Sequence, residues 1–428
     1  MFSSFFSTSA PTDPQAQNFF AVADGVPANE LYGELEQADT EWLCAGGFVT
    51  ETQVFYLITE DGKSIMCQVI HSSVGLWYPQ IQFTCKVYDS KTGEQVWKSV
   101  NVNNFVTPPP GLDKRSSKAD EYSITYKTHP DKPDFPESYS IVANLGPDAQ
   151  IFLDLKRYGA ARGFKVGKGP KGGHSYFGTD PEKADGYVVH RFWPRLFGEG
   201  HFVHNGKAQA ISGSGMFVHA IQGMRPNLVA ASWNFGHFQS SGDGGVSAIQ
   251  MEFSTINQYG KRGAGSGGVV VNVGSLVVGN KLVAVTAETK WPGEDPAPGE
   301  AVVQSKVTHL QPEHDPDTGY NKPNEILFEW KGKSLIPDAS GDISASALVN
   351  LGTVAKPQGL MEKVDVLAEI PYVVKMAVNY VAGTKPYIYQ WYNPAVLKIT
   401  GSEGIQAGLS QGVEVKGILY NEATFISV

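Results

Sequence analysis

Cysteine is scarce in this chain of 428 residues, which contains only Cys44, Cys67 and Cys85. Three is an odd number, and no two of these residues have the C-x-x-C spacing. The sequence therefore indicates neither a disulfide framework nor a thiolate zinc site. We expect a reducing compartment and a core that is stable without covalent cross-links, which a chain of this length can build.

Positive charge is missing from the beginning of the chain, where no Lys or Arg precedes Lys63. Secretory and mitochondrial leaders both need basic residues there. The sequence also has no run of about 20 apolar residues, the length that crosses a bilayer. The net charge of −9 is spread along the chain, whereas phosphate binding needs concentrated Lys and Arg. We expect no leader, no membrane span and no nucleic-acid partner.

Glycine and proline are plentiful, at 47 and 26 residues, and they separate short stretches in which apolar and polar side chains alternate. In one stretch Ile81, Phe83, Cys85 and Val87 share a face, which is typical of a barrel wall. Further strands are predicted at 53–58, 64–70, 122–127, 139–144, 150–155, 187–193, 246–253, 269–278, 281–290, 302–310 and 325–330. Since about eight strands close a small barrel, the sequence predicts an all-β protein with two antiparallel β-barrels in tandem and a few short helices.

We divide the chain into an N-terminal arm (1–40), a first barrel (41–212), a connector (213–227) and a second barrel (228–428). The connector is predicted to be helical because Phe217, Ala220, Ile221 and Met224 share one helical face. A second helix is predicted from Pro371 to 383, since proline suits the first helical position.

In the arm, Phe2, Phe5 and Phe6 fall on one face of a short helix that Pro11 would end. Two interpretations remain open. The arm either packs its phenylalanines against the protein's own barrel or dips them into a membrane. With no basic residue nearby, membrane contact would work by insertion rather than by attraction to anionic lipid.

Motifs for chemistry are few. Gly167, Gly169 and Gly172 match G-x-G-x-x-G, but the surrounding chain has no βαβ rhythm that would make it a nucleotide site. His201 and His204 lack the carboxylates or thiolates that would complete a metal site. No G-x-S-x-G elbow is present. We therefore predict no catalytic residue, no metal and no cofactor, although acid–base chemistry inside a barrel needs no local motif.

Four blocks of the sequence stand out for their length and their aromatic content. They are GMFVHAIQGMRPNLVAASWNFGHFQ at 215–239, HRFWPR at 190–195, ETQVFYLITEDGKSIMCQVIHSSVGLWYPQIQF at 51–83 and KPYIYQWYNP at 385–394. They closely resemble the fungal survival-factor family of oxidative-stress proteins, and the similarity covers nearly the whole chain after about residue 35.

The resemblance implies two tandem lipocalin-like (calycin) domains, survival of oxidative stress, and ceramide as a cargo carried from endoplasmic reticulum to Golgi. It implies a cytoplasmic location with peripheral contact to those membranes, with the nucleus as an alternative. Members attach through an amphipathic N-terminal helix, whereas the arm here is short, uncharged and interrupted by proline.

The leading hypothesis is therefore a monomeric carrier of ceramide or a related sphingolipid. Aromatic residues in these blocks would line an apolar site, and polar ones would pair with the lipid head. The lining candidates are Trp193, Phe217, Trp233 and Trp391, and the polar candidates are His190, His219, Gln222 and Tyr389. Two alternatives remain, an enzyme of the carotenoid-hydratase type and a stress scaffold without catalysis.

Overall fold

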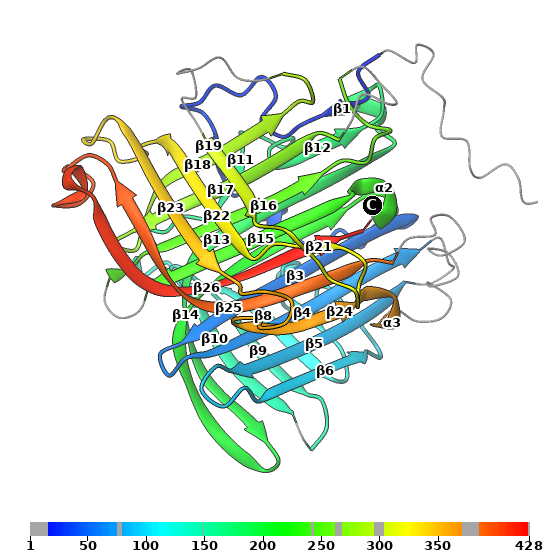
Figure 1. Cartoon of the computed structure of the whole chain (residues 1–428). Coiled ribbons are helices and arrows are strands. Elements are labelled where there is room, and N and C mark those ends of the chain that lie inside the picture. Colours follow the sequence, from blue (N-terminus) through cyan, green and yellow to red (C-terminus); the bar gives the residue numbers. More distant parts are fainter. Residues whose placement is uncertain are drawn as a thin grey trace, which may run out of the picture.

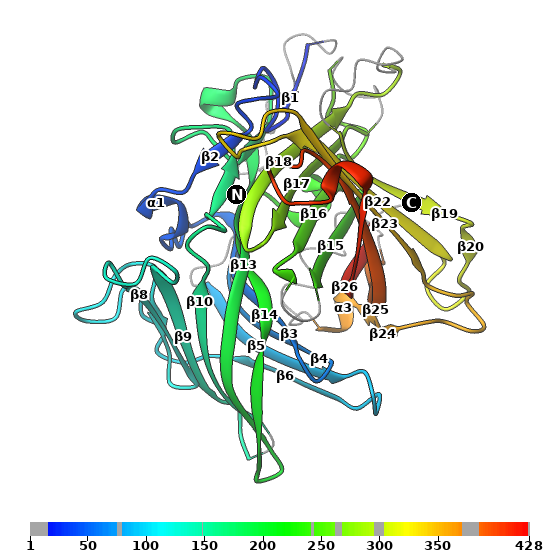
Figure 2. The same ribbon diagram turned by 90° about the vertical axis from the view of Figure 1, so that its left-hand side faces the viewer.

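The computed structural model describes residues 16–74, 79–147, 149–240, 244–261, 268–294, 304–369 and 385–426. Most of these residues form antiparallel strands in two large sheets (Figures 1 and 2). The described helices are single turns, namely α1 (Gln37–Thr40), α2 (Pro226–Val229), α3 (Val366–Glu369) and 3-10 turns at Pro181–Lys183 and Leu409–Gln411. Within the described residues, no helix has the length and apolarity needed to cross a membrane.

The first sheet forms a half-barrel. Its main path runs β6-β5-β4-β3-β14-β13-β10-β9-β8-β7, and β1, β2, β11 and β12 extend it beside β13. Its strands are β1 (Phe19–Phe20), β2 (Tyr32–Glu34), β3 (Phe48–Thr59), β4 (Lys63–Val74), β5 (Gln80–Asp89), β6 (Gln95–Asn101), β7 (Ser117–Lys118), β8 (Tyr122–Thr128), β9 (Glu137–Asn144), β10 (Gln150–Arg157), β11 (Phe164–Val166), β12 (His174–Phe177), β13 (Gly186–His204) and β14 (Lys207–Gln222).

The second sheet is a nearly closed barrel with the order β18-β17-β16-β15-β26-β25-β23-β22-β19, and β24 pairs with β25. Side chains join its two ends, since Thr286 Oγ1 of β18 lies 2.9 Å from Ser305 Oγ of β19. The strands are β15 (Ser232–Ser240), β16 (Ser247–Ser254), β17 (Val270–Val278), β18 (Lys281–Lys290), β19 (Gln304–Leu310), β22 (Glu325–Lys333), β23 (Asp342–Asn350), β24 (Leu360–Asp365), β25 (Tyr387–Thr400) and β26 (Val413–Phe425), with β20 (Glu313–His314) and β21 (Asn321–Lys322) as a separate hairpin. The predicted all-β fold with two β units in tandem is confirmed.

The two sheets pack against each other through their outer faces. Side chains from β3, β13 and β14 meet side chains from β15, β16, β17 and β18 in one apolar cluster, which includes Val54, Phe192, Met216, Phe235 and Val273. The opposite faces of the same strands line the two barrel interiors. Many central strands are therefore buried on both faces, and some carry apolar residues at successive positions, such as Met216, Phe217 and Val218.

The predicted helical connector is wrong. Residues 215–222 continue β14 and pair with both β3 and β13. Phe217 faces the first interior, whereas Met216 and Val218 face the second sheet. Because both faces of this strand are buried, apolar residues occur on each side and mimic a helical spacing. The helix predicted from Pro371 to 383 lies outside the described residues.

The described part of the arm, from residue 16 onward, is built into the fold. Phe19 and Phe20 pair with β12, and β2 pairs with β11. Phe19 is completely buried, and its ring centroid lies 4.9 Å from that of Phe177 and 6.2 Å from that of Trp291. This segment therefore sits between the two sheets. Phe2, Phe5 and Phe6 lie outside the described residues.

Candidate functional site

Aromatic side chains fill the interior of the half-barrel. Among them are Trp193 and Phe217, both buried in its core. The Phe217 ring centroid lies 4.8 Å from that of Phe55 and 5.1 Å from that of Tyr139, which in turn lies 5.0 Å from Trp193. The structure therefore places these two lining candidates in a packed core.

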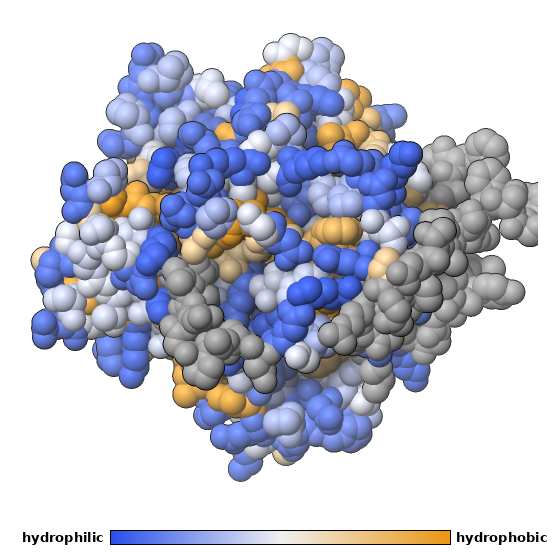
Figure 3. All heavy atoms as spheres, turned by 90° about the horizontal axis from the view of Figure 1, so that it is seen from above, coloured by the Kyte–Doolittle hydropathy of each residue, from blue (hydrophilic) through white to orange (hydrophobic). Residues whose placement is uncertain are grey.

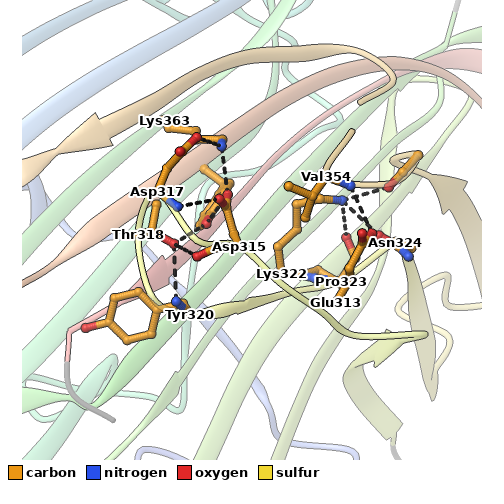
Figure 4. Close-up of polar contacts among 12 residues, drawn as sticks. Glu313, Asp315, Asp317, Thr318, Tyr320, Lys322, Pro323, Asn324, Val354 and Lys363 are labelled. Carbon is orange, nitrogen blue, oxygen red and sulfur yellow. Dashed lines mark hydrogen bonds and ion pairs between the residues drawn. The ribbon is translucent and has the colours of Figure 1, made fainter. Parts of the chain in front are cut away.

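Tyr389 and Trp391 are likewise buried, in the core of the second barrel. The loop that carries β20 and β21 lies against this end of the barrel (Figure 4). From inside, the Tyr389 hydroxyl donates to Asp315 Oδ2 over 2.8 Å and lies 2.6 Å from Thr318 Oγ1. Lys363 Nζ lies 2.8 Å from the same carboxylate. Burial acts to raise the pKa of Asp315, but the hydrogen bonds from Lys363 and Tyr389 outweigh it and lower that pKa.

A buried lysine holds the other side of this loop. Lys322 Nζ donates to the carbonyl oxygens of Pro323 and Gly352 and to Asn324 Oδ1, over 2.7–3.1 Å (Figure 4). Burial lowers the pKa of Lys322. Since buried polar groups are costly unless bonded, this set of contacts fixes the loop over the barrel end.

His219 is fully engaged elsewhere. Its Nε2 lies 2.8 Å from Glu51 Oε1 and its Nδ1 lies 2.8 Å from the carbonyl oxygen of Asp39. Both ring nitrogens face acceptors, so neither is left for a ligand. Gln222 ends β14 opposite Val188. Among the described residues, no three His, Cys, Asp or Glu side chains are arranged to hold a metal ion.

An apolar cavity lies between the two sheets. One wall comes from the first sheet and the arm, and the other from β16 and β17. It is narrow, with about 10 Å³ of free volume, roughly enough for one water molecule. The lining residues are Val22, Val166, Gly173, Ser175, Val188, His190, Phe192, Met251, Phe253, Val271 and Val273.

His190 is the titratable group in this cavity wall. Its side chain is buried, and burial lowers its pKa to about 4, so the ring is neutral at pH 7. Its centroid lies 5.8 Å from that of Trp233 and 6.1 Å from that of Phe192. No hydrogen bond joins the imidazole to another described residue. The structure therefore brings together two of the predicted candidates, His190 and Trp233, at the edge of the cavity.

An open groove adjoins the cavity and has a volume of about 340 Å³. The arm forms one side through Ala23, Asp24 and Val26, and the end of β18 with the residue after it forms the other through Glu288, Thr289 and Trp291, so the lining is partly polar. At the end of the molecule that carries β1 and β12, hydrophobic residues interrupt the polar surface (Figure 3). The space between the sheets thus has an enclosed part and an exposed part.

Two buried cations connect the sheets. Arg195 of β13 donates to Asn280 Oδ1, Gln239 Oε1 and Ser247 Oγ of the second half over 2.7–2.9 Å. Lys86 Nζ of β5 donates to Glu362 Oε2 over 2.5 Å and to Gln390 Oε1 over 2.6 Å. Burial lowers the pKa of Arg195 to about 10. These bonds hold the two sheets together.

Comparison with known proteins gives a family. The model of the Svf1 family matches residues 2–427. The chain belongs to the Svf1 family. Its relatives include the ceramide-binding protein svf1 of Schizosaccharomyces pombe, which is 33% identical over 409 residues, 95% of this chain and 93% of that protein. The ceramide-binding protein svf1 of Aspergillus fumigatus is 33% identical over 411 residues, with 92% and 91% covered.

Solved structures share the fold of this Svf1 family member at low sequence identity. The crystal structure of CghA with Sch210972 superposes with a TM-score of 0.57 at 11% identity, covering 89% of each chain. This similarity supports the architecture of two β units and carries no residue roles.

Part of the cavity wall of this Svf1 chain was missed by sequence reasoning. The strand predicted at 269–278 contains Val271 and Val273, but neither they nor Val22 of the arm were assigned to a site. A signal was present, since 269–278 is apolar on both faces, which indicates burial on both sides of the strand. That pattern tells which strands are central, but not what packs on them.

Proposed function

We propose that this Svf1 family member binds ceramide between its two sheets. The observation that carries the proposal is the space there, a narrow apolar cavity beside an open groove of mixed lining, since both interiors are filled by side chains. The relatives named ceramide-binding proteins support the choice of lipid. We place the aliphatic chain along the groove and cavity, and the polar head near His190 and Trp233.

The size of the groove suits part of an acyl chain. Its 340 Å³ are many times the ~10–15 Å³ that one water molecule needs on the same measure, so the groove has room for a segment of several methylenes. Burial of a methylene contributes about 0.8 kcal/mol, so such a segment supplies most of the affinity. A longer chain needs the narrow cavity to widen between the sheets.

The neutral imidazole of His190 suits the head of the lipid. It offers one N–H donor and one acceptor, and ceramide carries an amide and hydroxyl groups. A buried polar group without a partner costs about 1–3 kcal/mol. Pairing with His190 would favour ceramide over a chain that lacks the amide.

The test compares His190→Phe with His201→Phe, a matched change on β13, where His201 stacks on Phe152 with centroids 5.5 Å apart on the exposed outer face. We expect about 1–3 kcal/mol of ceramide affinity to be lost in the first variant and none in the second. Native mass spectrometry with lipid extraction first shows whether the protein carries ceramide. Titration with a fluorescent ceramide then measures the affinity of each variant. Absence of ceramide binding by the unaltered protein would refute the proposal, and conversion of the lipid during incubation would favour the enzyme alternative.

The proposal extends to transfer of ceramide from endoplasmic reticulum to Golgi membranes and to survival of oxidative stress. The resemblance to survival-factor proteins supports both. Transfer is measured as movement of ceramide between donor and acceptor vesicles. We also propose that the protein acts as a monomer in the cytoplasm. Phe2, Phe5 and Phe6 would contact the membrane during transfer.

A further inference from the structure

The cavity and the groove lie one strand apart. Val271 and Val273 of the cavity wall are directly paired with Thr289 and Ala287 of the groove wall. Paired strands are about 4.8 Å apart. On the opposite side, Val22 lines the cavity and its neighbour Ala23 lines the groove. The same stretch of the arm therefore borders both spaces.

We call residues 23–30 the strap. Its hydrogen bonds are internal to residues 21–30, namely Asp24 N to Ala21 O, Ala21 N to Asp24 Oδ2, Val26 N to Ala23 O and Glu30 N to Pro27 O. Among the described residues, no hydrogen bond joins the strap to the rest of the chain. Its one ion pair, Glu30 with Lys168 at 3.5 Å, is exposed and contributes little.

Both ends of the strap are anchored. On one side, Val22 N donates to Ser175 Oγ over 3.0 Å. Four residues earlier, Asn18 Nδ2 donates to Gln258 O over 2.7 Å, and Asn18 Oδ1 accepts from Gly260 N over 2.8 Å. On the other side, Gly167 N donates to Leu31 O over 2.8 Å. Between these anchors, Ala23 and Val26 are partly buried against the apolar cluster between the sheets. No described hydrogen bond adds to this packing, so the loop opens at a lower free-energy cost than a paired strand does.

Within the strap, Gly25 adopts a φ of +72°, a conformation that glycine reaches without strain. It lines the groove together with Ala23, Asp24, Val26 and Ala28. The segment thus consists of two tight turns facing β18, able to move as a unit between its anchors.

We propose that the strap is the gate of the lipid site, and that its movement away from β18 joins the groove and the cavity into one channel. This inference rests on the proposed function for the nature of the ligand, but the gating itself requires no lipid. A gate sets how fast the ligand enters and leaves. It changes the entry and release rates by the same factor and leaves the dissociation constant nearly unchanged.

The first experiment uses protein without lipid. In a Cys44→Ser background, Val271→Cys places a reporter thiol in the cavity wall, and its modification by a water-soluble disulfide reagent follows the opening of the gate. Ser175→Ala removes the acceptor of Val22 N. We expect labelling about fivefold faster, the factor for one hydrogen bond of typical net strength.

Ser116→Ala is the matched control. Ser116 Oγ is buried and accepts a backbone N–H from Tyr126 over 2.9 Å, far from the strap. The Ser116→Ala substitution removes the same kind of bond, and we expect it to leave the labelling rate unchanged. Equal acceleration in both variants, or none with Ser175→Ala, overturns the gate.

The second experiment measures release of a fluorescent ceramide. Ser175→Ala speeds release about fivefold. Joining Ala28→Cys to Thr289→Cys with a reducible bifunctional thiol reagent, again with Cys44→Ser, stops release until reductant is added. If Ser175→Ala accelerates labelling but the protein binds no ceramide, the ceramide proposal is refuted and the gate stands. Ceramide release at an unchanged rate in the cross-linked protein overturns the gate.

Discussion

Replacing Glu51 with Gln tests whether the His219 cluster is structural. Both side chains are 0% exposed. Besides the bond from His219, the Glu51 carboxylate accepts the backbone N–H groups of Leu43 and Cys44, over 2.7–3.1 Å. Gln keeps the size of the side chain but replaces one carboxylate oxygen with an NH₂ group. The Cys44 N–H then loses its acceptor, and His219 Nε2 faces an amide in place of a carboxylate.

We expect Glu51→Gln to lower the free energy of unfolding by about 3–5 kcal/mol at pH 7, the usual cost of breaking a buried charged pair. Burial acts to raise the pKa of Glu51, but the bonds from His219 and the backbone outweigh it and hold that pKa below its usual 4.5. A depressed acid pKa stabilises the fold above the unfolded value, and this contribution is lost as pH falls through the folded one. The difference between the two proteins therefore shrinks below pH 4.5.

Urea unfolding followed by tryptophan fluorescence measures this loss, at pH 7 and again at pH 4. His219→Gln should cost a similar amount, and the double variant should cost less than the sum because the pair is coupled. Folded His219→Gln protein should retain its ceramide affinity. A loss below about 1 kcal/mol at pH 7, well under the range for a buried pair, would refute the structural role, as would weaker ceramide binding by folded His219→Gln.

Three further predictions concern other parts of the molecule. Arg195→Met leaves several buried acceptors of the second sheet without a donor, at about 1–3 kcal/mol each, and should lower the free energy of unfolding in urea by about 3 kcal/mol or more. Trp233→Ala should weaken ceramide binding in the fluorescence titration and cost less stability than a fully buried Trp, since Trp233 is only half-buried; unchanged affinity would contradict its place at the site. Combined substitution of Phe2, Phe5 and Phe6 by Asp should abolish flotation with liposomes while thermal stability stays constant, and flotation that persists would rule out this contact.

The sequence predicted strands well where apolar and polar residues alternate or where the turns are clear. The alternation from Ile81 to Val87 lies in β5 and the hairpin around Gly62 joins β3 to β4. The prediction failed at residues 215–222, where a helix was expected. Both faces of β14 are buried there, so apolar and polar residues do not alternate with the period of two that indicates a strand. The pattern of one strand cannot reveal a second sheet packed on its outer side.

The candidate site was harder to predict for a related reason. His190 and His219 are the same residue type in neighbouring strands, yet one lies in the cavity wall and the other is held by Glu51, 168 residues earlier in the chain. Likewise, Val22, Val188 and Val273 meet in the cavity from three distant segments. Which histidine is available depends on these long-range contacts, and no local spacing encodes them.

The place of Asn18 between the two sheets has a consequence for how the protein is made. Its amide bonds to Gln258, 240 residues later, so the ribosome must synthesise more than half of the chain before this contact of the arm can form. At about 5–20 residues per second, this interval is on the order of ten to fifty seconds. Phe19 and Phe20 can pair with β12 earlier, once residue 177 has been made. The arm therefore docks in two stages, first on its own sheet and later on the second one.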